Sequence, residues 1–129
     1  MDELVRWLGA QLDEDERIAR AVEDRSAPFD GQWMADGNSA VRTLNGHVLF
    51  YRHDSGPLKP GLADHVVTHD PARVLREIEA KRDLLRLAQR AHDYPETFMN
   101  GFASALEGTL RLFAAAYTDR PGYQASWRP

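Results

Sequence analysis

The chain has 129 residues, 43% hydrophobic and 28% charged, a composition that supports one globular domain over residues 1–129 rather than a disordered chain. Its formal net charge of −4 argues against a general nucleic-acid binder, because such domains are usually basic. It has no cysteine, which excludes disulfides, cysteine-ligated zinc, iron–sulfur clusters and thiol nucleophiles.

The first predicted element is a helix over residues 2–24. Asp15 falls within its apolar face, where a carboxylate needs a partner because an isolated buried charge is costly. The start of the chain is charged rather than apolar, and no stretch approaches the ~20 apolar residues of a membrane span. We therefore expect a cytoplasmic protein. The apolar positions recur at the helical period: Leu4, Leu8, Leu12, Ile18, Ala19 and Val22.

Residues 29–52 change to a strand pattern and predict a small antiparallel β-meander. Asn45-Gly46 lies between two apolar runs and is typical of a tight hairpin turn, because both central positions need positive φ. Asp36-Gly37 indicates an earlier turn, and hence a third strand before it. Gly-Pro and Pro-Gly pairs then indicate an irregular loop over 53–62.

The second half of the chain is predicted to be helical. Residues 63–69 fit either a short helix or a strand, and Asp70 is a good N-cap for a long helix over 71–92. A further helix is expected over 96–117, followed by a tail over 118–129 that forms one last turn. The fold class is therefore α+β: three main helices with a small antiparallel hairpin or three-stranded meander packed on one side. The aromatic positions expected in the core of the last helix are Phe98, Phe102, Phe113 and Tyr117.

Several stretches resemble the DUF6221 family of uncharacterised actinobacterial and actinophage proteins. They are Leu12–Glu16, His65–Arg82, Thr109–Leu112 and Tyr117–Pro129. The resemblance implies no function and no catalytic residues for this chain. The family usually has a histidine where this chain has Arg120, which counts against any metal site that needs that position.

A second resemblance is architectural. A tryptophan-containing strand, a short hairpin and a small-residue segment before a long helix resemble phage ead/Ea22-like proteins. This resemblance implies a phage or mobile-element context and no chemistry.

Two histidines four positions apart are candidate metal ligands. His65 and His69 share one face whether the segment is a helix or a strand. Asp70 could add an oxygen ligand, and Asp15 could approach from the first helix. The alternative is structural: Asp70 caps the next helix, while one histidine packs against the first helix. The residues between the histidines are Val-Val-Thr, so the glutamate of a zinc-protease motif is missing.

The helix over 71–92 is locally basic. Its outer stripe combines Arg76, Arg86 and Arg90 with Glu79 and Asp83. A mixture of both signs is typical of a solvated, ion-paired face, whereas a phosphate-binding stripe would exclude the acids. A nucleic-acid accessory role for this helix is therefore the weaker alternative, and the acidic first helix of this chain or of a second copy is the preferred partner.

Aromatic side chains outside the predicted core are candidate interaction anchors, which interfaces favour: Trp33, Tyr51, Tyr123 and Trp127. For Trp127 the alternative is that it holds the tail on the body. No Gly-rich phosphate loop or nucleophile motif occurs, so no cofactor is expected and an enzyme is the less favoured class. The alternative is a metal-binding protein or a metal-dependent enzyme that uses His65, His69 and Asp70. We expect a non-enzymatic interaction or accessory module that binds a protein partner or forms a homodimer.

Overall fold

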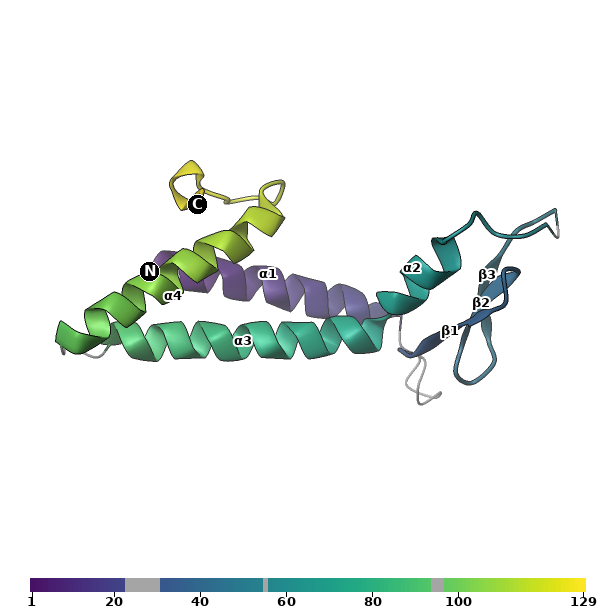
Figure 1. The fold of residues 1–129 in the computed structure, drawn as a ribbon, viewed down its shortest axis with the longest axis horizontal. Coiled ribbons are helices and arrows are strands. Elements are labelled where there is room, and N and C mark those ends of the chain that lie inside the picture. The colour runs from purple at the N-terminus through teal and green to yellow at the C-terminus, as the bar shows by residue number, and fades with distance from the viewer. Residues whose placement is uncertain (23–30, 55, 94–96) are drawn as a thin grey trace. The chain divides into compact units, whose positions relative to one another are not determined.

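The computed structural model describes residues 1–22, 31–54, 56–93 and 97–129, except the side chains of 97–99 (Figure 1). Its three strands form one antiparallel sheet in the order β1-β2-β3, so the meander is confirmed, and with it the α+β class. The described elements are α1 (Asp2–Ala21), β1 (Trp33–Asp36), β2 (Ala40–Thr43), β3 (Val48–Tyr51), α2 (Leu62–Thr68), α3 (Pro71–Asp93), α4 (Thr97–Ala114) and the 3₁₀ turns η1 (Ala115–Tyr117) and η2 (Ala125–Trp127).

The chain divides into two compact units, which are described separately below. Unit 1 consists of residues 1–14 and 78–129, and unit 2 consists of residues 15–77. The helices α1 and α3 each contribute residues to both units. The expectation of a single domain over residues 1–129 stays a prediction.

Unit 1 is helical. Leu4, Leu8 and Leu12 are each only 2% exposed, which confirms the first part of the predicted apolar face of α1. Arg82 on α3 donates to Asp13 on α1 at 2.6 Å and so joins two helices of this unit. The other buried apolar side chains of the unit come from α3, α4 and the C-terminal turns: Ile78, Leu85, Ala88, Ala91, Leu106, Leu110, Ala114, Tyr117 and Trp127.

Unit 2 contains the sheet and α2. Val41 on β2 is fully buried and packs with Leu58 and Ala63. The predicted hairpin is present, but its turn is one residue longer than the predicted two-residue form. The N–H of Gly46 donates to the carbonyl of Thr43, so Leu44 and Asn45 are the central turn residues, and Gly46 follows them with φ +88. Partly buried side chains complete this small core: Trp33, Ala35, Phe50, Val66 and Val67.

The junction before α3 resolves the ambiguity at residues 63–69 in favour of a helix. α2 covers Leu62–Thr68, and His69 is its C-cap. Asp70 then caps α3 as predicted, because its Oδ1 accepts from the backbone N–H of Arg73 at 2.8 Å. The break between α2 and α3 is therefore explained by the capping carboxylate of Asp70 and by Pro71, which follows it.

Three core predictions are wrong. Ile18 and Val22 are 49% and 52% exposed, so the predicted apolar face of α1 is not buried at these two positions. Phe102 on α4 is 45% exposed, because the buried face of that helix runs through Leu106 and Leu110. Phe98 and the ends of the predicted elements at 23–24 and 29–30 lie outside the described side chains.

Candidate functional site

The sheet of unit 2 has one packed face and one open face. Side chains alternate along a strand, and the pairing register aligns Met34, Arg42 and Val48 in one row and Asp36, Ala40 and Tyr51 in the next. A β-bulge in β3, where Leu49 has no partner residue in the β2–β3 register, lets Val48 and Tyr51 share a face although they are three positions apart. Leu44, two positions after Arg42, continues the same alternation just beyond the end of β2, where its N–H donates to the carbonyl of Gln32. We call the whole set the open face: Met34, Asp36, Ala40, Arg42, Leu44, Val48 and Tyr51.

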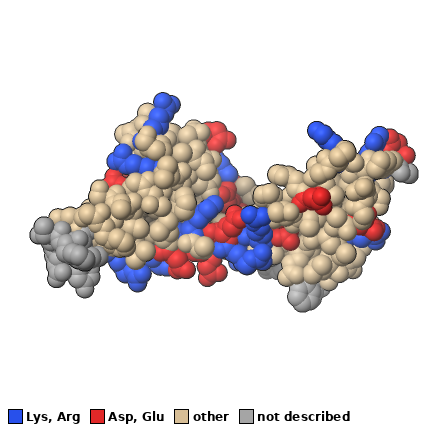
Figure 2. All heavy atoms as spheres, viewed as in Figure 1, with Lys and Arg blue, Asp and Glu red and all other residues tan. Residues whose placement is uncertain are grey.

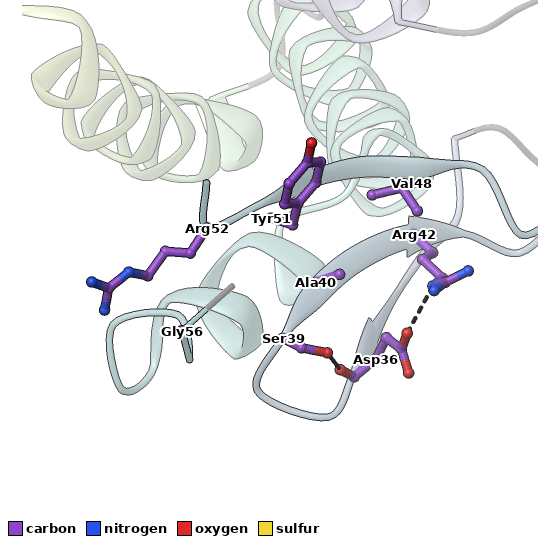
Figure 3. A pocket seen from close by; sticks show the side chains of 8 residues that line it. All are labelled: Asp36, Ser39, Ala40, Arg42, Val48, Tyr51, Arg52 and Gly56. Carbon is purple, nitrogen blue, oxygen red and sulfur yellow. Dashed lines mark hydrogen bonds and ion pairs between the residues drawn. The ribbon is translucent and has the colours of Figure 1, made fainter. Parts of the chain in front are cut away.

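Large apolar side chains of the open face lie in solvent. Met34 is 45% exposed, Leu44 50%, Val48 46% and Tyr51 66%. A hollow of about 300 Å³ lies on this face (Figure 3). Its lining residues are Asp36, Ser39, Ala40, Arg42, Val48, Tyr51, Arg52 and Gly56.

The charges on and beside this face are paired within the unit. Arg42 Nε donates to Asp36 Oδ2 at 2.8 Å across two strands. Arg52 extends away from the sheet in Figure 3 and pairs with Asp54. Its guanidinium, together with the N–H of Gly56, holds the pKa of the Asp54 carboxyl below its ordinary value. The hollow therefore offers balanced charge beside apolar surface, which suits contact with a folded partner better than binding of a free anion.

The two edges of the sheet differ. The N–H of Trp33 on β1 donates to Asp70 Oδ2 at 3.2 Å, and the carbonyl of Gly31 accepts from the N–H of Ala72. The start of α3 thus occupies part of the β1 edge. Among the described strands β3 pairs only with β2, so its other edge faces no strand. Exposed edges of this kind are sites where another chain can pair.

The candidate metal ligands are only partly brought together. The rings of His65 and His69 lie 4.6 Å apart between centroids, which confirms that they share a face. His69 Nδ1 lies 2.8 Å from the carbonyl oxygen of His65 and donates to it. Asp70 already uses both carboxylate oxygens as acceptors, and Asp15 is only half-buried. Within the part of the chain that the structure describes, no three His, Asp or Glu side chains gather as a metal site would require.

Of the aromatic anchor candidates, only Tyr51 is clearly exposed. Trp33 is half-buried against the core of unit 2, and Tyr123 is half-buried in unit 1. For Trp127 the structure favours the alternative given above, because this side chain is only 7% exposed and packs on Trp7, where it holds the tail on the body of unit 1.

A cluster of aromatic rings explains how the tail is held, and Trp7 at its centre was missed in the sequence. The ring of Trp7 lies 5.1 Å from that of Trp127 and 5.8 Å from that of Tyr123, and its Nε1 donates to the carbonyl of Pro121 at 3.0 Å. Gly122 has φ +81, and a Cβ there would lie 3.0 Å from Trp7 Nε1. In the sequence, Trp7 lies just outside the apolar face of the first helix, which by itself is weak evidence for a structural role. The aromatic residues of the tail are the signal that could have identified Trp7 as their packing partner.

The outer-stripe arginines of α3 are exposed, but the surface around them is mixed. Arg86 pairs with Asp83, and Arg73 pairs with Glu77 at 2.8 Å. Arg76 and Arg90 are also exposed. Figure 2 shows Lys and Arg atoms interleaved with Asp and Glu atoms rather than gathered into one basic area. In the described part of the chain, no helix is both long and apolar enough to cross a membrane.

These features define a small α+β protein with an open sheet face. The family model of DUF6221, a family of unknown function, matches residues 1–129, and the chain therefore belongs to that family. No curated protein and no solved structure matches the chain. The family gives the chain a place among related sequences but no reaction.

Proposed function

We propose that this protein is a non-enzymatic interaction module whose binding surface is the open face of the unit 2 sheet. The observation that carries the proposal is the exposure of four large apolar side chains on one face: Met34, Leu44, Val48 and Tyr51. Single exposed apolar residues are ordinary, but several on one face are typical of protein-interaction sites, and two of these, Val48 and Tyr51, line the hollow. Two ion pairs, on the face and at its rim, supply the polar border that interfaces use.

The arrangement of polar groups supports binding over catalysis. Arg42 and Asp36 satisfy each other, and Arg52 is engaged by Asp54 and by the carbonyl of Pro57. A catalytic group needs a perturbed environment and a position beside a reacting atom. The polar side chains of the hollow instead hold one another in place.

Site-specific photo-crosslinking in cells that encode the protein tests the proposal. A photoreactive amino acid in place of Tyr51 should give a defined crosslinked band. The same amino acid in place of Glu79, which is exposed on α3, should not. Equal crosslinking from both positions, or none from Tyr51, would contradict a binding role for the open face.

A second candidate function rests on the contact between the rings of His65 and His69. Two exposed imidazoles on one helical turn suit a surface zinc site completed by a partner or by water. Metal analysis of protein purified without a metal-affinity tag tests this candidate, together with the melting temperature in added zinc. We expect bound zinc and a melting shift that His69→Ala abolishes, and no shift in the parent protein would exclude the candidate.

The remaining parts of the sequence interpretation stay predictions. They are the cytoplasmic location, the phage or mobile-element context and the nucleic-acid alternative for α3. The ion pairs of Arg73, Arg82 and Arg86 with neighbouring acids favour a solvated face over a phosphate-binding one.

A further inference from the structure

The open face is too apolar to be explained as ordinary surface of a small sheet. A three-stranded sheet is stable when one face packs on a helix, and α2 with Leu58 provides that packing on the opposite side. The exposed apolar side chains are therefore not required by the core of unit 2. A molecule that covers these side chains has to be complementary to a face that is apolar, contains a hollow and carries both positive and negative charges.

The charges on this face indicate what kind of partner fits. Arg42 on the central strand β2 pairs with Asp36 at the end of the edge strand β1, and a second pair, Arg52 and Asp54, lies at the rim of the face. A face with balanced charge selects neither an acidic nor a basic partner. It is, however, complementary to itself, because a two-fold rotation brings the cation of one copy beside the anion of the other.

The exposed apolar side chains of the face would form the centre of a small interface with a second copy. Tyr51 is 66% exposed and Met34, Leu44 and Val48 are each close to half exposed. A biological interface buries roughly 1,000 Å² or more in total, so the polar residues around them must contribute as well. Sheets that stack face to face lie about 10 Å apart, which is close enough for their side chains to interdigitate. An interface of this size is expected to be reversible and dependent on concentration.

We propose that two copies of this chain pair open face to open face about a two-fold axis. Arg42 of each copy then lies beside Asp36 of the other, and the apolar side chains around them are removed from water. The pairing rests on the proposed function, since it assigns the partner of the same surface. It predicts a weak homodimer in which each copy contributes an identical patch.

Charge reversal provides the test, because the side chains of Arg42 and Asp36 are 40% and 47% exposed and can face a second copy. We expect Asp36→Arg and Arg42→Asp each to weaken the dimer at least tenfold in sedimentation velocity, since each places like charges opposite each other. An equimolar mixture of the two variants should dimerise again, because the copies then carry opposite charges. Circular dichroism checks that each variant keeps its secondary structure.

A matched control pair lies elsewhere in unit 2. Arg73 and Glu77 form an ion pair whose side chains are 41% and 48% exposed, against 40% and 47% for Arg42 and Asp36. Arg73→Glu and Glu77→Arg should leave self-association unchanged. Equal weakening by both pairs of variants would mean that net charge, not the open face, governs association, and would overturn the proposal.

The remaining outcomes separate this proposal from the function on which it rests. A parent protein that stays monomeric up to nearly millimolar concentration overturns the homodimer. If the Tyr51 crosslinker then captures a different protein, the interaction module stands with another partner. If the crosslinked band has twice the mass of the chain and disappears in Arg42→Asp, both proposals are supported.

Discussion

In unit 1 the rings of Trp7, Tyr123 and Trp127 pack against one another, whereas in unit 2 the ring of Tyr51 lies in solvent. The first group joins the start of the chain to its end, and 114 positions separate Trp7 from the carbonyl that it binds. The second group lies on a sheet whose core is complete without it. Similar aromatic side chains therefore stabilise the fold in one unit and remain available for binding in the other.

The sequence alone does not separate these two uses. Tyr51, Tyr123 and Trp127 are all candidate interaction anchors in the sequence, because each lies outside the predicted core. What distinguishes them is whether a neighbouring segment covers the ring. In unit 1 the cover is the tail itself, and in unit 2 no described element covers Tyr51.

The largest expected effect comes from removing an aromatic ring of unit 1. Trp127→Ala should lower the free energy of unfolding by about 3–5 kcal/mol, because it removes a buried ring and leaves a cavity beside Trp7. Tyr51→Ala should change it by less than about 0.5 kcal/mol, since that ring is 66% exposed. Urea denaturation followed by circular dichroism measures both, and similar losses would remove the contrast between the units.

Asp70 is the next most sensitive position, because it holds α3 and β1 together inside unit 2. Asp70→Ala should cost roughly 1–2 kcal/mol, since the N–H groups of Arg73 and Trp33 both lose their acceptor. Asp70→Asn keeps one acceptor oxygen and should recover about half of the loss. If Asp70→Ala left the melting temperature unchanged, the carboxylate would not be a structural cap, and its role as a candidate metal ligand would regain support.

Tyr123→Phe should stabilise the protein, in contrast to the two substitutions above. The Tyr123 hydroxyl oxygen is buried and has no hydrogen-bond partner among the described residues. Removing a buried unsatisfied group should raise the free energy of unfolding by up to about 1 kcal/mol. Tyr51→Phe is the control, because its hydroxyl lies on an exposed residue and its removal should leave the melting temperature unchanged. A lower melting temperature for Tyr123→Phe would reveal a partner for that hydroxyl.

The smallest effect is expected for Glu107, whose side chain accepts from Arg111 at 2.8 Å. The hydrogen bond from Arg111 holds the pKa of Glu107 below its ordinary value of 4.5, and Arg111 also donates to the carbonyl of Ser126 in the tail. Because the folded pKa is the lower one, this stabilisation is present above pH 4.5 and is lost as the pH falls through the folded pKa. Glu107→Gln should therefore cost less than about 1 kcal/mol at neutral pH, and the difference should vanish in acid. A cost that does not depend on pH would contradict this assignment.

The local parts of the fold could be predicted from the sequence because each rests on neighbouring residues. Asp70 and Pro71 specify a helix start, and Asn45-Gly46 specifies a turn with positive φ at Gly46. The apolar repeat of Leu4, Leu8 and Leu12 likewise specifies a buried helix face.

The candidate surface could be predicted only in part, because it depends on contacts between distant residues. Tyr51 is a candidate in the sequence. Met34, Leu44 and Val48 are not, because the cross-strand register and the bulge determine that they lie on the same face as Tyr51. The division of α1 into buried leucines and an exposed Ile18 also depends on what packs beside the helix. Periodicity records where apolar residues lie on an element and not whether another element covers them.

The nesting of one unit inside the sequence of the other has a consequence for synthesis. Residues 15–77 leave the ribosome as one uninterrupted stretch, while residues 1–14 must wait for partners beyond residue 78. At ~5–20 residues per second, the delay between Trp7 and Pro121 is on the order of ten seconds. The leucines of the first helix have no C-terminal cover until residues from 78 onward emerge. All residues of the inserted unit are therefore synthesised before the enclosing unit can close over its last turn.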